Sequence, residues 1–230
     1  MKKALQKNRF KFTNTICLEL GPGRSSLDAY NCLMNGARLV YLVDKYPRKM
    51  ISSKEYVREI QFMKKKFHKN PAFLLGEGRL DDTFIKLIPR DVSALKSSVK
   101  VDLLFSFSVM EHIKEVERNI QKFHNLLKKD GLMYHSIDLR DHYNFNDPFL
   151  FYKYSDKTWN EYLVKEGVTY TNRLRYDDYI SLFEKHDFKI VEEHITKYPL
   201  PSTSRLSKKF RTADREMLRI GIVRLLLKKL

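Results

Sequence analysis

The sequence predicts an α/β protein organised around a mostly parallel β-sheet. Short apolar runs alternate with longer amphipathic segments over the first two thirds of the 230 residues, which is typical of βαβ units. The first apolar run leads directly into the turn Gly21-Pro22-Gly23, and glycines let a backbone approach a ligand closely. The length suits one domain, so we expect residues 1–230 to form a single domain.

The apolar runs fix the expected order of the elements. Several runs are apolar at consecutive positions, as strands buried on both faces are, and we expect strands at 15–20, 38–43, 72–75, 101–105, 132–137 and 189–195. Apolar residues at helical spacing and a glycine cap at Gly36 predict helices at 26–35, 52–69, 111–128 and 176–185. The segment 219–229 fits a final strand or a basic amphipathic helix, and we favour the strand.

An aromatic-rich stretch follows the fifth strand. From 140 to 175 the sequence shows no clear period but is rich in aromatic side chains, among them Phe145, Phe149, Phe151, Tyr152, Tyr154, Trp159, Tyr162 and Tyr170. We expect an insertion that packs as a lid over the working edge of the sheet.

The formal net charge of +16 is concentrated at the two ends of the chain. Such a balance favours an anionic partner, namely a phosphorylated small molecule, nucleic acid or a membrane surface, although a solvated basic surface is the simpler alternative. No apolar run approaches the roughly 20 residues of a membrane-spanning helix, and the basic N-terminus lacks the apolar stretch of a signal peptide. We expect a cytoplasmic protein, with a peripheral position on the inner face of the membrane as the alternative. Cys17 and Cys32 are expected to be packing residues.

One acid stands just before the glycine-rich turn, and another follows the next apolar run. Glu19 precedes Gly21 by two positions, and Asp44 and Lys45 follow the second apolar run. A helix that starts near Ser26 offers free N–H groups to an anionic group. An acid at the tip of the second strand can accept hydrogen bonds from the two ribose hydroxyls of an adenosine cofactor. These residues therefore predict an adenosine-type cofactor site.

The pattern Glu-x-Gly-x-Gly at Glu19–Gly23 resembles the first motif of class I S-adenosylmethionine-dependent methyltransferases. The run Asp102–Ile113, with Ser106, Ser108, Glu111 and His112, looks like the fourth-strand motif of that family, and the match extends over residues 12–140. The resemblance implies a Rossmann-like three-layer sandwich and a seven-stranded sheet with an antiparallel last strand. It also implies S-adenosylmethionine as cofactor and S-adenosylhomocysteine as product.

By the same resemblance, the cofactor is held by Glu19, Gly21, Pro22, Gly23, Asp44, Lys45, Ser106 and Ser108. The acid beside the adenine usually follows the third strand. Here Glu77 is the candidate, with Asp81 or Asp82 as alternatives.

Acid–base candidates cluster after the fifth strand. His142 or His135 could deprotonate an acceptor hydroxyl, with Asp138 or Asp141 orienting the imidazole. His112 is a rival base. A metal site made from the same residues and a purely structural role are the alternatives, and we predict no metal.

The segment 135–175 is similar to methyltransferase-domain proteins found with bacterial surface-polysaccharide biosynthesis enzymes. This resemblance implies O-methylation of a sugar, or of a phosphorylated or nucleotide-linked precursor, in capsule synthesis. Arg140, Arg173 and Arg175 would then grip phosphate, and Trp159 would stack on the acceptor. The alternatives are an RNA methyltransferase, although no RNA-binding module is recognisable, and a non-catalytic cofactor-binding or membrane-surface protein.

Overall fold

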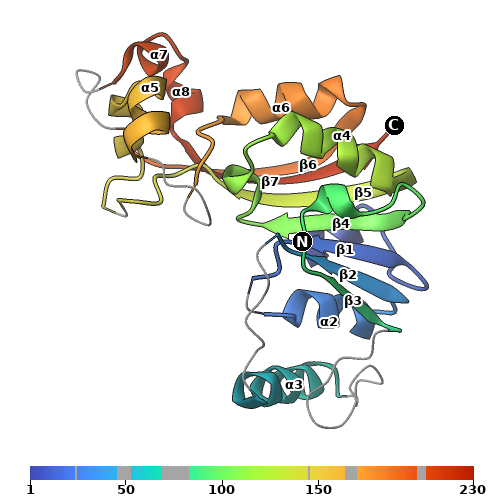
Figure 1. Ribbon diagram of the computed structural model, residues 1–230. Helices are drawn as coiled ribbons and strands as arrows, with labels where there is room; N and C mark the ends of the chain where they lie inside the picture. The colour runs from blue at the N-terminus through green and yellow to red at the C-terminus, as the bar shows by residue number, and fades with distance from the viewer. Residues whose placement is uncertain (24, 46–52, 69–82, 145, 164–169, 201–205) are drawn as a thin grey trace.

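The computed structural model describes residues 1–23, 25–45, 53–68, 83–144, 146–163, 170–200 and 206–230 (Figure 1). In this part of the chain, seven strands form one sheet in the order β3-β2-β1-β4-β5-β7-β6. The strands are β1 (Ile16–Leu20), β2 (Leu39–Val43), β3 (Ile85–Ile88), β4 (Val101–Phe107), β5 (Leu127–Asp138), β6 (Phe188–Lys197) and β7 (Ile220–Lys229). β1 to β5 pair in parallel, whereas β7 runs antiparallel to both β5 and β6. The predicted sheet, including its antiparallel last strand, is confirmed.

The strand beside β2 is β3, which the sequence analysis missed. The predicted strand at 72–75 lies outside the described residues. β3 is an edge strand, and of its four residues only Ile85 is fully buried, with Lys86 and Leu87 exposed. A strand with one buried position does not show the continuous apolar run that marks a strand covered on both faces.

Helices cover both faces of the sheet, giving three layers (Figure 1). On one face, α4 (Val116–Leu126) and α6 (Tyr176–Lys185) bury Ile120, Phe123 and Phe183. On the other, α1 (Lys2–Lys7), α2 (Leu27–Met34) and α3 (Ser53–Phe67) pack over the second core. Cys17 and Cys32 are buried and free within that second core, as expected.

The predicted helix 111–128 is shorter in the structure. α4 begins only at Val116, and the residues before it form a separate 3₁₀ turn, η3 (Met110–His112). This turn is held by hydrogen bonds from His112 N to Val109 O and from Ile113 N to Met110 O. His112 therefore lies on a tight turn at the end of β4 rather than within a helix.

The aromatic residues after β5 form a small core of their own, which we call the aromatic lobe. Its buried residues are Phe149, Phe151, Tyr152, Trp159, Leu206, Phe210 and Leu218. The lobe contains η4 (Leu150–Lys153), α5 (Asp156–Thr158), the π-helical turn η5 (Trp159–Leu163), α7 (Lys208–Arg211) and α8 (Arg215–Leu218). Figure 1 shows α5, α7 and α8 together beyond one end of the sheet. The predicted insertion 140–175 thus supplies half of the lobe, and the connection between β6 and β7 supplies the other half.

The C-terminal segment is a strand, not a basic amphipathic helix. Val223, Leu225 and Leu227 of β7 are buried in the main core. The membrane-surface alternative required this segment to be an amphipathic helix with an exposed apolar face, and in the structure those apolar side chains are packed in the core instead. No helix among the described residues is long and apolar enough to cross a membrane.

Candidate active site

A cavity of about 990 Å³ opens where β1, β2 and β4 end. Leu20, Val43 and Phe107, the last residues of these strands, all line it. Its volume lies at the upper end of the range of small-molecule sites, roughly 300–1,000 Å³. In open parallel sheets, ligands bind outside the carboxyl ends of the strands, and this cavity has that position.

The glycine turn forms the floor of the cavity at the end of β1. Gly21 N donates to Val43 O at 2.8 Å, and Gly21 has a φ of 65°. A Cβ on Gly21 would lie 2.6 Å from Val109 Cγ2. Gly23 also has a positive φ, but a Cβ there would meet nothing within 4 Å. Gly21 is therefore required by packing, whereas Gly23 faces open space.

This contrast gives a prediction. Gly21→Ala is expected to lower the free energy of unfolding by about 3 kcal/mol, because left-handed backbone strain and the clash with Val109 add together. Gly23→Ala, the matched control, incurs only the backbone strain of about 1–2 kcal/mol. Urea unfolding of the two variants measures both values, and equal losses would contradict the packing argument.

The structure brings only part of the predicted cofactor set to the cavity. Pro22, Asp44, Lys45 and Ser108 line it together with the two glycines. Glu19 is buried in β1 and Ser106 in β4, and neither lines the cavity. Glu77, Asp81 and Asp82 lie outside the described residues. The role of Glu19 in holding the cofactor stays a prediction.

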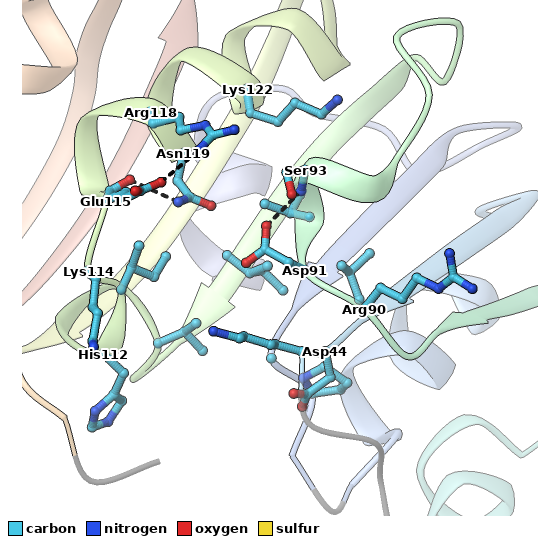
Figure 2. Close-up of a pocket in the computed structure, with 18 of the residues that line it drawn as sticks. Asp44, Arg90, Asp91, Ser93, His112, Lys114, Glu115, Arg118, Asn119 and Lys122 are labelled. Carbon is cyan, nitrogen blue, oxygen red and sulfur yellow. Dashed lines mark hydrogen bonds and ion pairs between the residues drawn. The ribbon is translucent and has the colours of Figure 1, made fainter. Parts of the chain in front are cut away.

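Asp91 is a lining acid that the sequence analysis did not identify. It follows β3 by three positions, and its Oδ1 accepts a hydrogen bond of 2.9 Å from Ser93 N, which caps the 3₁₀ turn η2 (Val92–Ala94). Figure 2 shows Asp91 and Asp44 as the acids that follow β3 and β2 on neighbouring parts of the wall. An acid just after a parallel strand indicates a residue at the ligand-binding edge of the sheet. Asp91 was not identified in this way because the strand before it, β3, was not predicted.

His112 lies on the opposite part of the wall, on the turn η3 (Figure 2). Its Nδ1 is 2.5 Å from Tyr170 O. A carbonyl oxygen can only accept, so Nδ1 carries the proton and Nε2 keeps its lone pair in the neutral ring. His112 is therefore held in the tautomer that a general base acting through Nε2 requires.

His142 and Asp138 lie behind His112 and do not line the cavity. The His142 ring packs edge-on against the His112 ring, with 4.9 Å between centroids, and burial lowers the pKa of His142. His142 Nε2 is 3.9 Å from Asp138 Oδ2, too far for a hydrogen bond.

Asp138 forms an ion pair with Arg140. The guanidinium donates from Nε and from the second terminal nitrogen to the two carboxylate oxygens, at 2.8 and 2.7 Å. Burial raises the pKa of Asp138, but these bonds outweigh burial and the net pKa is lowered. Arg140 also packs over the Tyr198 ring and does not line the cavity.

His135 is a core residue. It is fully buried on β5, its ring stacks on Phe183, and its Nδ1 lies 2.7 Å from Ser106 Oγ. Burial lowers its pKa to about 3, so the ring is neutral at physiological pH. The pair formed by His135 and Ser106 fastens β5 to β4, and neither residue reaches the cavity.

Of the three other predicted acceptor contacts, Trp159 lies in the aromatic lobe, and Arg173 and Arg175 pack against its rings. The Arg173 guanidinium donates to Tyr154 O at 2.8 Å and Ser155 O at 3.3 Å, and it packs over the Trp159 ring. Arg175 donates to the carbonyls of Leu139, Leu218 and Ile220. Trp159 is 3 % exposed and donates from Nε1 to Thr171 O. All three side chains are buried and none lines the cavity.

The cavity has its own basic residues instead. Arg90, Lys114, Arg118 and Lys122 line it, together with Lys45. Figure 2 shows Arg118 and Lys122 on α4, with Arg90 on the opposite wall. Arg118 pairs with Glu115 at 3.0 Å, and Lys122 donates to Leu95 O at 2.6 Å. Among the described residues, no group of three or more His, Cys, Asp or Glu side chains could hold a metal ion.

Glu111 is a buried acid beside this site. It is 3 % exposed, and its Oε1 accepts a hydrogen bond of 3.1 Å from Asp138 N. Burial raises the pKa of the Glu111 carboxyl from 4.5 to about 8, so it is protonated at neutral pH.

The raised pKa of Glu111 predicts a pH dependence of stability. Between pH 4.5 and 8 the folded chain keeps a proton that the unfolded chain releases, so stability falls as pH rises through this window. Glu111→Gln stays neutral at every pH, so its free energy of unfolding should not show this fall. The difference in unfolding free energy, variant minus wild type, should therefore rise by about 2 kcal/mol from pH 6 to pH 8. Urea unfolding of both proteins at the two pH values measures this difference. A constant difference between them would contradict the prediction.

Comparisons with known proteins agree with this geometry. A family model for a methyltransferase domain matches residues 1–193. No curated protein matches the chain.

Solved structures share the fold at low identity. An S-adenosylmethionine-dependent methyltransferase from Mesorhizobium loti is 14% identical, with a TM-score of 0.54 over 99% of this chain and 96% of that one. One from Clostridium acetobutylicum has the same identity and TM-score, over 99% and 88%. The 1,6-didemethyltoxoflavin-N1-methyltransferase of Burkholderia thailandensis, solved with S-adenosylhomocysteine, is 14% identical, with a TM-score of 0.51 over 99% and 75%.

Proposed function

We propose that this chain, which belongs to the methyltransferase-domain family, uses S-adenosylmethionine to methylate a hydroxyl of a small anionic or sugar-linked acceptor. One observation carries the choice of a hydroxyl. His112 faces the cavity in the tautomer that leaves Nε2 free to accept a proton.

The cavity fits an adenosine cofactor. Gly23 faces open space, so the backbone of the turn can approach a ligand without a side chain between them. Asp44 would accept hydrogen bonds from the ribose hydroxyls, and Asp91 from the exocyclic amine of adenine. Both carboxylates line the same cavity, at the ends of neighbouring strands. S-adenosylmethionine supplies an electrophilic methyl group on a sulfonium centre.

His112 is the proposed general base. Its Nε2 would take the proton of the acceptor hydroxyl, and Tyr170 O would stabilise the resulting imidazolium through Nδ1–H. The proposal moves the catalytic role from His142 and His135, which do not line the cavity, to His112, which does.

The charges of the cavity support an anionic acceptor. Arg90, Lys114, Arg118 and Lys122 line the cavity with three acids. Asp44 and Asp91 are assigned to the cofactor, and Glu115 pairs with Arg118 at 3.0 Å, so the cations outnumber the acids left for the acceptor. Arginine and lysine bind phosphate through charge-assisted hydrogen bonds. We therefore propose a phosphorylated or nucleotide-linked sugar as the acceptor. A role in surface-polysaccharide (capsule) synthesis is the matching proposal from the sequence resemblance.

Calorimetry tests the cofactor. S-adenosylmethionine and S-adenosylhomocysteine are titrated into the full chain, with NAD as the control for a nucleotide that lacks the methionine part. Micromolar binding of the first two and none of NAD is expected. Absence of binding by both would overturn the proposed function.

A screen then tests the acceptor class. Phosphorylated sugars, nucleotide-linked sugars, their unphosphorylated counterparts and a bulk RNA are incubated with the protein and cofactor, and the products are analysed by mass spectrometry. Methylation of the phosphorylated compounds in preference to the neutral sugars is expected. Methylation of RNA alone would replace the proposal with the RNA methyltransferase reading.

A further inference from the structure

Residues Tyr170–Leu174, which we call the strap, pass between the turn η3 and the aromatic lobe. On one side, Tyr170 O accepts the hydrogen bond from His112 Nδ1. Asn172 contacts the same turn through its side chain and its backbone. On the other side, Thr171 and Arg173 contact the lobe. Successive residues of the strap thus alternate between the turn that carries His112 and the lobe.

Asn172 holds the whole turn. Its Nδ2 donates to Met110 O at 2.9 Å and to Ile113 O at 3.0 Å, and its backbone N donates to Glu111 O at 2.8 Å. These three acceptors span the turn from its first residue to the residue after its last. The Tyr179 hydroxyl, on α6, donates to Asn172 Oδ1 at 3.3 Å, which fixes the orientation of the amide.

The lobe holds the strap. Trp159 Nε1 donates to Thr171 O at 3.2 Å. Arg173, whose side chain is 2 % exposed, donates to Tyr154 O and Ser155 O and packs between the rings of Trp159 and Phe210. Aromatic packing and buried cations of this kind fix a segment rigidly, since each buried donor loses a partner if the segment moves.

We propose that Asn172 is a positioning residue, which holds the turn η3 so that Tyr170 O fixes the tautomer of His112, and that the aromatic lobe anchors the strap through Trp159 and Arg173. The inference rests on the proposed function, in which His112 is the base. It gives the lobe a task other than stacking on an acceptor, because its aromatic rings pack on one another and on Arg173.

The test reads the His112 ring directly. In ¹⁵N-histidine-labelled protein, His112 is assigned by its loss in His112→Gln, and the ¹⁵N shifts report which ring nitrogen carries the proton. Wild type is expected to show protonated Nδ1 and bare Nε2. Asn172→Ala should shift the ring toward the Nε2–H form and lower kcat at least tenfold, with the affinity for S-adenosylmethionine unchanged.

Two further variants complete the design. Trp159→Phe keeps an aromatic ring but removes the donor to Thr171, and it should shift the His112 tautomer in the same direction by a smaller amount. This variant tests the inference independently if Asn172→Ala fails to fold. Asn35→Ala is the matched control, because Asn35 also donates its side-chain amide to a backbone carbonyl, that of Asn31, at the end of α2. It should leave His112 unchanged.

An unchanged tautomer in both Asn172→Ala and Trp159→Phe would overturn the inference. So would a shifted tautomer with kcat within twofold of wild type. A fully active His112→Gln would instead remove the base from the proposed function, and the tautomer data would still report whether the strap holds the ring.

Discussion

The Asp44→Ala variant is expected to bind S-adenosylmethionine about 10²–10⁴-fold more weakly than the wild-type chain. Asp44 stands at the end of β2 on the wall of the cavity, and its carboxylate would accept from both ribose hydroxyls. Hydrogen bonds to a charged group contribute about 1.5–3 kcal/mol each, and every 1.4 kcal/mol is about tenfold in affinity. Calorimetric titration of the variant measures the loss. Affinity within threefold of wild type would remove Asp44 from the cofactor site.

A variant of Asp91 tests the proposed adenine contact independently of the ribose contact of Asp44. Asp91→Ser keeps a residue that can cap η2 but no longer reaches an adenine amine, so a loss of about tenfold is expected from one hydrogen bond. Asp214→Ser is the matched control, since Asp214 caps α8 in the aromatic lobe in the same way. Equal affinities of the Asp91 and Asp214 variants would show that Asp91 does not contact the cofactor.

The His112→Ala variant should lose about 10²–10⁴-fold in kcat, the usual contribution of a general base, while its affinity for S-adenosylmethionine stays at the wild-type value. The split is expected because His112 lies across the cavity from the acids assigned to the cofactor (Figure 2). Single-turnover methyl transfer to the acceptor from the screen measures kcat separately from binding.

His142→Ala distinguishes the two neighbouring histidines. The rings touch, but His142 does not line the cavity, so a loss of less than tenfold is expected. If the larger loss followed His142 instead, the base would be His142 and the tautomer of His112 would have no catalytic meaning.

Local patterns predicted most of the strands and helices, and the family resemblance implied how the strands are arranged in the sheet. Apolar runs such as those of β1 and β4 predicted strands covered on both faces, and the turn at Gly21 predicted the end of β1 at which the cavity opens. Even the ambiguous tail was predicted correctly as β7. The miss was β3, since an edge strand with one fully buried residue carries almost no periodic signal.

Which polar residues meet in the cavity was decided by the tertiary structure. His112, His135 and His142 are equivalent candidates in the sequence. In the structure, His112 lines the cavity, His135 is fully buried, and His142 packs against the His112 ring without lining the cavity. Arg173 and Arg175 are of the residue type that binds phosphate, but in the structure both are buried and donate to backbone carbonyls.

Burial patterns within single segments therefore predicted a mostly parallel sheet and the end of it at which the cavity opens, and the family resemblance added the seven-stranded arrangement with its antiparallel last strand. The tertiary structure alone decided the tautomer of His112 and the partners of Asn172, because these depend on contacts between residues about sixty positions apart. The direction of a side chain and the group that it meets are properties of packing, and no local pattern encodes them.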